Sequence, residues 1–435
     1  MLSAFASAFR TPDLRNKLLF SIAMIGLYRL GASVPTPGVS VKNINQCIGI
    51  VSSGSSANLY SLVNLFSGGA LLKLSVFALG IMPYITASII IQLLVVVIPR
   101  FEQLKKEGQS GQAKLTQYTR YLTVALAILQ STGIIALAKN NQLFPGCPLP
   151  TLTDSSIYTV ISMVVTMSAG TCMVMWLGEL LTDRGVGNGM SVLIFTSIAA
   201  QIPTEGQTLL RNGGGFTFFL LCLLVLAIIT AVVFVEQAQR RIPVQYAKRM
   251  VGRRMYGGTS TYLPLKVNQA GVIPVIFAAS LLYIPQLFSQ LQGTSTSAFS
   301  RFVTNNLVNQ GNWVHISIYF ALNIFFTYFY VSITFNPEER ADDMKKYGGF
   351  IPGIRPGRPT TEYLGFVLSR ITFPGSLYLA TVAVLPNFFF SFSAGANQNF
   401  PFGGTAVLIL VGVGLDTVKQ IESQLMQRNY EGFLR

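Results

Sequence analysis

Long apolar stretches of the length that crosses a bilayer dominate this sequence. A helix needs about 20 apolar residues to span the hydrocarbon core, and in lipid it must bond its own backbone N–H and C=O groups. Ten stretches meet or approach this length, and 190–202 is the shortest. They cover approximately 18–33, 70–98, 121–138, 157–177, 190–202, 216–235, 268–291, 314–335, 364–386 and 405–424. The sequence therefore predicts an all-α, polytopic membrane protein.

The distribution of charge sets the orientation of these spans and requires the short one. The chain has 31 Lys and Arg against 16 Asp and Glu, and Lys and Arg collect in cytoplasmic loops. Ten spans place both termini and twenty-five bases in the cytoplasm and leave only five outside, namely Lys42, Lys73, Lys139, Arg211 and Arg301. Omitting 190–202 would move six bases of one loop outside, namely Arg240, Arg241, Lys248, Arg249, Arg253 and Arg254. We therefore predict ten transmembrane helices.

A short motif occurs twice, once in each set of five spans. Residues 80–87 read G-x-x-P-x-I-x-A, and so do residues 271–278, in the second span of the second set. An odd number of spans per set means that a repeat between the sets is inverted across the membrane, and interrupted helices at matching positions indicate a functional midplane. Ordinary helix kinks would leave the same pattern. If the repeat is real, Ile85 and Ile276 are equivalent and face each other.

The two sets of spans define the predicted domains. We expect a cytoplasmic segment at 1–17, an N-terminal half at 18–203, a C-terminal half at 204–425 and a cytoplasmic tail at 426–435. The C-terminal half carries two long cytoplasmic loops, at 237–266 and 336–362. Residues 240–266 include seven bases and no acid, which fits binding to phosphate-rich RNA or to an acidic protein face. Such a loop can also do no more than enforce orientation.

A second irregularity precedes the second span. Residues 58–66 form an apolar, helix-like segment that ends at Ser67, Gly68 and Gly69. Nine residues reach about 14 Å, roughly half the hydrocarbon thickness. The segment is either a removable stopper on a glycine hinge or a re-entrant packing helix, and its composition does not distinguish the two.

Ionisable residues avoid the middle of the predicted spans. Glu179, Glu236 and Asp416 lie near cytoplasmic ends, and Arg29 lies in the first span, where it can reach the interface or pair. Ion-coupled transporters need ionisable groups within the membrane, so their scarcity argues against that class. No phosphate-binding G-x-x-x-x-G-K-[ST] motif and no hydrolase signature occurs, and the chain has a single His. We predict no enzyme activity, no cofactor and no metal site.

Two of the four cysteines fall in predicted external segments. A disulfide between Cys47 and Cys147 is chemically allowed there, although their spacing says nothing of their distance. Cys172 and Cys222 lie within spans and are interpreted as packing residues.

Five passages carry a resemblance to a known family. They are NLFSGGALLKLSVFALGIMPYITASIIIQLL from Asn64, KKEGQSGQAKLTQYTRY from Lys105, RGVGNGMS from Arg184, LPLKVNQAGVIPVIF from Leu263 and GGFIPGIRPGRPT from Gly348. Along essentially its whole length the chain resembles the SecY family of protein-conducting channels in the bacterial plasma membrane. The resemblance implies two inverted five-helix halves closed around an hourglass pore. It also implies a lateral gate to lipid, through which transmembrane segments leave.

The resemblance assigns roles to particular residues. The plug and its hinge correspond to about 58–69, including Asn64, Leu65, Phe66, Ser67, Gly68 and Gly69. The pore ring corresponds to Ile81, Ile85, Ile194, Ile276 and Ile409. The gate lies between the second and third spans and the seventh and eighth, with Thr86, Gln92 and Asn268 as polar members. Docking residues correspond to Arg253, Arg254, Arg355 and Tyr430.

The resemblance also implies the partners and the reaction. The expected partners are the membrane subunits SecE and SecG, the SecA ATPase, the ribosome, signal sequences with unfolded preproteins, and membrane lipid. The expected function is passage of unfolded preproteins across the membrane, driven by SecA or the ribosome. An inverted-repeat secondary transporter of small solutes is the alternative.

Overall fold

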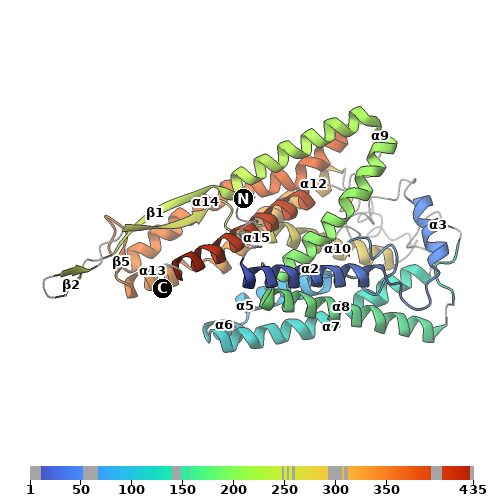
Figure 1. The fold of residues 1–435 in the computed structure, drawn as a ribbon, viewed down its shortest axis with the longest axis horizontal. Coiled ribbons are helices and arrows are strands. Elements are labelled where there is room, and N and C mark those ends of the chain that lie inside the picture. The colour runs from blue at the N-terminus through green and yellow to red at the C-terminus, as the bar shows by residue number, and fades with distance from the viewer. Residues whose placement is uncertain are drawn as a thin grey trace.

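The fold is known from a computed structural model, which is mostly helical (Figure 1). It describes residues 11–51, 67–139, 147, 149–154, 156–246, 249–251, 254–256, 260–291, 306–307, 312–392 and 404–431. The helices are α2 (Pro12–Ser33), α3 (Val41–Val51), α5 (Met82–Val97), α6 (Pro99–Lys106), α7 (Gln109–Lys139), α8 (Ile157–Arg184), α9 (Gly189–Gln237), α10 (Ile273–Leu291), α12 (Trp313–Thr334), α13 (Pro337–Lys346), α14 (Arg358–Phe392) and α15 (Gly404–Glu431). The strands are β1 (Gln239–Tyr246), β2 (Arg249–Val251), β3 (Arg254–Tyr256), β4 (Ser260–Lys266) and β5 (Gly349–Phe350).

The described helices cover most of the residues of the predicted spans. By length and composition, four helical stretches of the described chain can cross a membrane: Gln109–Lys139, Ile157–Arg184, Trp313–Lys346 and Arg358–Leu385. A fifth is added if α5 and α6, which meet at a bend of 100°, form one span. Shorter apolar helical stretches occur at Gly189–Pro203, Val225–Gln237 and Ile273–Leu282.

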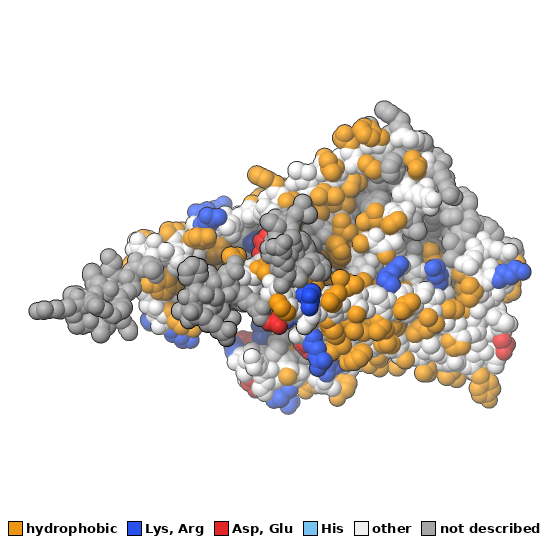
Figure 2. Space-filling model, viewed as in Figure 1, with side chains coloured by type: hydrophobic (Ala, Val, Ile, Leu, Met, Phe, Trp, Pro, Cys, Tyr) orange, Lys and Arg blue, Asp and Glu red, His pale blue; other side chains and the backbone are white. Residues whose placement is uncertain are grey.

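Large apolar side chains point outward from these helices. Leu129 on α7, Phe219 and Phe234 on α9 and Phe373 on α14 are each more than half exposed. Apolar side chains cover much of the helical body in Figure 2. Such a surface suits contact with lipid, since a water-soluble protein rarely exposes continuous apolar patches of this extent.

The fifth and sixth predicted spans form one helix. The sequence treats 190–202 and 216–235 as separate, whereas α9 runs without interruption from Gly189 to Gln237 with Pro203 inside it. Asn188 caps its first turn, since its side-chain oxygen accepts a hydrogen bond from the Met190 amide at 3.1 Å. Figure 1 shows α9 as two legs joined at a bend. The predicted boundary between the halves, at 203/204, therefore lies inside a helix.

The second predicted span begins later than the sequence indicates. Residues 68–81 form turns, and helix α5 starts only at Met82. Gly80 has a φ of 54°, and Leu74 has a φ of 45°, which a helix does not accept. The backbone of this stretch bonds to the chain after α2 instead: the Thr36 amide donates to Leu74 O at 3.0 Å, and the Val76 amide donates to Val34 O at 2.9 Å. Local turn bonds and these two distant bonds replace helical hydrogen bonds, so apolar composition alone placed the start of α5 too early.

The two predicted cytoplasmic loops fold together into a small sheet. Strands β1 and β4 are antiparallel over seven residue pairs, from Gln239↔Lys266 to Gln245↔Ser260. Strand β5, from the second loop, pairs with the other edge of β1 through Gln245↔Phe350 and Tyr246↔Gly349. The Arg241 guanidinium lies 4.9 Å from the ring centroid of Tyr262, so this arginine also stabilises the hairpin. We call β1, β4 and β5 the cytoplasmic sheet, after the location that the sequence predicts for the two loops.

The molecule has two distinct ends (Figure 1). The cytoplasmic sheet, α6 and α13 lie toward one end, where α2 begins and α15 ends, while α3 lies at the opposite end. The structure joins Cys47 of α3 to Cys147 by a disulfide with a Cα–Cα distance of 5.4 Å. Both cysteines are buried in a cluster with Ile44, Leu74 and Met163. This bond closes a loop of 100 residues at the end remote from the cytoplasmic sheet.

We predict that Cys47→Ser lowers the free energy of unfolding by roughly 2–5 kcal/mol, because the disulfide restricts the unfolded chain. The thermal unfolding midpoint in detergent measures this effect, and Cys222→Ser, at a free and exposed cysteine, is the control. Thiol labelling of the denatured, unreduced chain should modify two of the four cysteines. Labelling of all four without reductant would contradict the bond.

Candidate functional site

The two copies of the repeated motif begin two helices in the same way. Gly80 and Gly271 adopt positive φ values of 54° and 63°, and each stands two residues before its helix starts. Pro83 and Pro274 are the second residues of α5 and α10, where a missing N–H leaves no hydrogen bond unmade. The motif therefore marks a helix start rather than a kink inside a long helix.

The first hydrogen bonds of these helices extend the correspondence. The Ile85 amide donates to Ile81 O at 3.1 Å, and the Ile276 amide donates to Val272 O at 3.4 Å. Ile85 and Ile276 are thus structural equivalents, as the motif predicts. Val272 is the equivalent of Ile81, and the sequence interpretation missed it although the same alignment would have found it.

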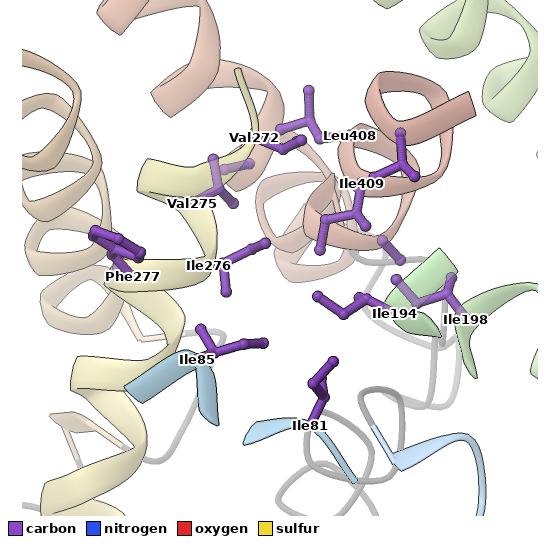
Figure 3. Packing of buried hydrophobic residues seen from close by; sticks show 14 of the residues in the cluster. Ile81, Ile85, Ile194, Ile198, Val272, Val275, Ile276, Phe277, Leu408 and Ile409 are labelled. Atoms are coloured by element: carbon purple, nitrogen blue, oxygen red, sulfur yellow. The ribbon is translucent and has the colours of Figure 1, made fainter. Parts of the chain in front are cut away.

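Five isoleucines from four helical segments meet in one buried cluster. Ile85 lies on α5, Ile194 on α9, Ile276 on α10 and Ile409 on α15, while Ile81 directly precedes α5. Their exposed fractions range from 0% to 8%. Figure 3 shows the five side chains directed toward one another, with Ile198, Val272 and Leu408 beside them. We call these five residues the isoleucine ring. Helices α9 and α15 pack on each other and α10 packs on α5, so the ring joins both predicted halves.

The predicted plug is only partly described. Asn64, Leu65, Phe66 and the rest of 58–66 lie outside the described residues, whereas the hinge Ser67, Gly68 and Gly69 lies within them. Gly68 and Gly69 have φ values of 65° and 88°. A Cβ on Gly68 would lie 2.8 Å from Arg29 Nη1 and 3.2 Å from Ser197 Cα. Glycine is favoured at position 68, because its positive φ strains other residues and a Cβ would crowd Arg29 and the Ser197 backbone.

Arg29 is bonded to this hinge. Its Nη1 donates to Gly68 O at 3.0 Å, and the hydroxyls of its neighbour Tyr28 and of Ser197 on α9 lie 2.8 Å apart. An arginine within a membrane span is costly unless it is paired. The sequence left open whether Arg29 reaches the interface or pairs, and the structure has it paired with the hinge carbonyl.

The three predicted polar gate residues have separate partners. Thr86 donates to Met82 O at 2.9 Å, and Gln92 donates to Ser88 Oγ at 3.4 Å, both within α5. Asn268 stands between β4 and α10 and donates to Glu236 Oε1 at 2.5 Å. The structure therefore places Asn268 at the base of the cytoplasmic sheet, in a different hydrogen-bond network from Thr86 and Gln92.

The helices that the gate prediction names do meet. Helix α10 contacts α5 and α7, and it also packs on α12. At one edge Lys105 of α6 donates from Nζ to Ile333 O, 3.1 Å away, at the C-terminal end of α12. The last carbonyls of a helix lack partners within it, and a cation there is favourable. No local pattern in the sequence indicates this bond, which joins the two predicted halves.

The predicted docking residues that the structure describes lie toward the end of the molecule that carries the cytoplasmic sheet. Arg254 begins β3, and Arg253 lies outside the described residues. Arg355 is exposed in the turn after β5, between Gly353 and Gly357, whose φ values are 83° and 104°. Tyr430 is the second-last residue of α15.

Together these features define a class of protein. A bundle of apolar helices with an apolar outer surface, and two halves that meet at a ring of aliphatic side chains, is typical of a membrane channel.

Comparison with known proteins makes the class specific. The sequence model of the SecY family matches residues 75–418. The protein translocase subunit SecY of Mycobacterium bovis is 66% identical over 441 residues, covering 100% of both chains, and that of Streptomyces coelicolor is 63% identical with the same coverage.

Two solved structures share the fold. One, described as "The plug domain of the SecY protein stablizes the closed state of the translocation channel and maintains a membrane seal", has a TM-score of 0.64 and 17% identity and covers 94% of this chain and 92% of that one. The other, "Sec61 in the Canine ribosome-channel complex from the endoplasmic reticulum", has a TM-score of 0.57, 16% identity and the same coverage.

The chain therefore belongs to the SecY family. It is a multi-pass membrane protein and a preprotein translocation channel, not a secondary transporter of small solutes. Its relatives are channel subunits, which are not enzymes.

We predict that Ile85→Asn and Ile276→Asn each raise ion conductance at least severalfold and loosen the selection of signal sequences, because an amide wets an apolar constriction. Single-channel conductance in planar bilayers measures the first effect. Ile91→Asn is the matched control, since Ile91 is buried on the same helix but packs in a different cluster, with Val95 and Leu115. Unchanged conductance in both ring variants would remove these residues from the constriction.

Proposed function

We propose that the isoleucine ring is the seal of a passive pore for unfolded polypeptide. The observation that carries this proposal is the convergence of five buried isoleucines from four helical segments, two of them equivalent through the repeated motif (Figure 3). Branched aliphatic side chains make no directional hydrogen bonds, so they close around a moving chain of any sequence without trapping it. They also disfavour a continuous file of water, which limits ion leakage while the channel is closed.

The proposed lateral gate lies between α5 and α7 on one side and α10 and α12 on the other. The contacts of α10 with α5 and α7, and the bond from Lys105 to Ile333 O, support this location. A signal sequence is itself an apolar helix that lipid accepts. Separation of these helices lets such a segment enter the bilayer, while polar segments continue through the ring.

The proposed plug is the segment 58–69. The glycine hinge, the hydrogen bond from Arg29 to Gly68 O and the contact of Gly68 with Ser197 support a defined attachment point for it. The related channel whose description assigns a membrane seal to its plug domain supports the same role.

The proposed energy source is a partner, either the SecA ATPase or a translating ribosome. The canine Sec61 channel, which has the same fold, is described in a complex with a ribosome. In this chain the docking surface is the cytoplasmic sheet with its β2–β3 tip, and Arg253, Arg254, Arg355 and Tyr430 are the docking residues. SecE and SecG are the proposed membrane subunits, and both termini lie in the cytoplasm of a bacterial cell.

Reconstitution tests the proposed function. The channel in lipid vesicles, with purified SecA, ATP and an unfolded secretory precursor, should protect that precursor from added protease. Vesicles without the channel and reactions without ATP are the controls, because the pore itself supplies no energy. Absence of protection in the presence of active SecA would overturn the proposal.

We predict that Arg355→Glu impairs SecA-driven export, because it reverses the charge within the exposed turn that we propose as part of the docking surface. The channel should still insert and assemble, because this side chain is exposed. Protease protection per channel measures export, and Arg355→Lys, which keeps the charge, should export more than Arg355→Glu. Normal export by Arg355→Glu would discard the docking role of Arg355.

A further inference from the structure

The cytoplasmic sheet is joined to the membrane helices at one narrow base. Glu236 is the second-last residue of α9 and lies three residues before the start of β1, and Asn268 follows β4 by two residues. Asn268 Nδ2 donates to Glu236 Oε1 at 2.5 Å, and beside it the Val267 amide donates to Ala238 O at 3.0 Å. The β1–β4 hairpin is therefore closed at its base by a side-chain hydrogen bond and a backbone hydrogen bond.

The side-chain pair is buried and incompletely satisfied. Glu236 is 9% exposed and Asn268 is 2% exposed. Asn268 Oδ1 finds no hydrogen-bond partner among the residues that the structure describes, and neither does the hydroxyl of Tyr378 on α14. Burying polar groups in this way costs free energy that aliphatic side chains of similar size would not. Stability alone therefore does not account for the Glu236–Asn268 pair.

The pair is hydrogen-bonded directly to the start of α10, the helix that carries Ile276 of the isoleucine ring. The same Asn268 amide donates to Gly271 O at 3.1 Å. Gly271 holds the positive-φ turn that starts α10, and Ile276 lies in the first turn of that helix. A displacement of the hairpin base thus reaches Ile276 through one amide group.

Neighbouring helices support the opposite side of this connection. A Cβ on Gly375 of α14 would lie 2.5 Å from Val267 O, so α14 packs directly against the segment between β4 and α10. Lys266 Nζ lies 3.4 Å from Asp416 Oδ1 on α15, the helix that also carries Ile409. That ion pair is exposed and therefore weak, whereas the Glu236–Asn268 pair is buried and also bonds to Gly271.

We propose that the Glu236–Asn268 pair is a positioning element that couples movement of the cytoplasmic sheet to α10 and so to the isoleucine ring. The proposal rests on the proposed function in one respect, that the energy-supplying partner docks on the cytoplasmic sheet. Glu236 and Asn268 act through α10 and do not contact the translocating chain. Loss of the pair leaves partner binding and ATP hydrolysis intact but separates them from opening of the ring.

A double variant separates coupling from structure. Glu236→Leu and Asn268→Leu each leave the other member of the pair buried without its partner, whereas the double variant replaces both side chains by aliphatic ones. The double variant also removes the hydrogen bond from Asn268 to Gly271 O, so it cuts the whole connection to α10. We expect the double variant to assemble, to unfold thermally and to bind SecA like the parent. The amount of precursor protected per ATP hydrolysed should fall roughly tenfold, the factor that corresponds to about 1.4 kcal/mol.

Conservative and neighbouring variants are the controls. Glu236→Gln keeps an acceptor for Asn268 and should retain most of the parental yield per ATP. Lys266→Ala removes only the exposed ion pair and should also retain it. If the leucine variants fail to assemble, the same measurements of precursor yield per ATP and of SecA affinity are made on Asn268→Ala. A fall in yield with unchanged SecA affinity then supports the coupling role, and an unchanged yield overturns it.

The outcomes distinguish this inference from the proposed function. If the parental channel protects no precursor, the proposed function fails. If the parental channel does protect precursor and the double variant reaches the same yield per ATP, the coupling role of Glu236 and Asn268 is overturned. A fall in yield with unchanged SecA affinity and thermal stability supports it.

Discussion

The need to satisfy backbone hydrogen bonds without water governs this structure. In lipid a chain meets that need by forming helices, which is why most of the described chain is helical. Residues 68–81 are the informative exception among the apolar stretches. They form turns with local hydrogen bonds rather than a helix, and distant backbone groups at Val34 and Thr36 bond to Val76 and Leu74. That irregular segment lets α5 begin in the interior of the fold and bring Ile81 and Ile85 to the ring.

The same constraint explains what the sequence could predict. Apolar length located most of the helices, and the glycine and proline of the repeated motif identified Ile85 and Ile276 as equivalents, because those signals are local. The start of α5, the pairing of Arg29 with Gly68 and the bond from Lys105 to α12 depend on residues far apart in the chain. Neither the hydrophobic periodicity nor the composition of the sequence indicates such contacts, so only the structure could reveal them.

The cytoplasmic sheet was missed for a related reason. Its parts are short, and β5 is separated from its partner β1 by about a hundred residues, including two long helices. Ile242 and Val244 in β1 alternate with other residues, and so do Leu263 and Leu265 in β4, which is a weak strand signal that Pro243 and Pro264 obscure. The basic character of the loop drew attention to charge, whereas part of that charge, at Arg241, also packs on an aromatic ring.

The pairing of β5 with β1 joins the loops 237–266 and 336–362 into one structural unit. A partner that binds and displaces either loop therefore displaces both, together with α13 and the start of α14. For evolution and for engineering this means that neither loop is an independent module. Exchanging one of them alone between relatives would break the pairing of Gln245 with Phe350 unless its counterpart changed in step.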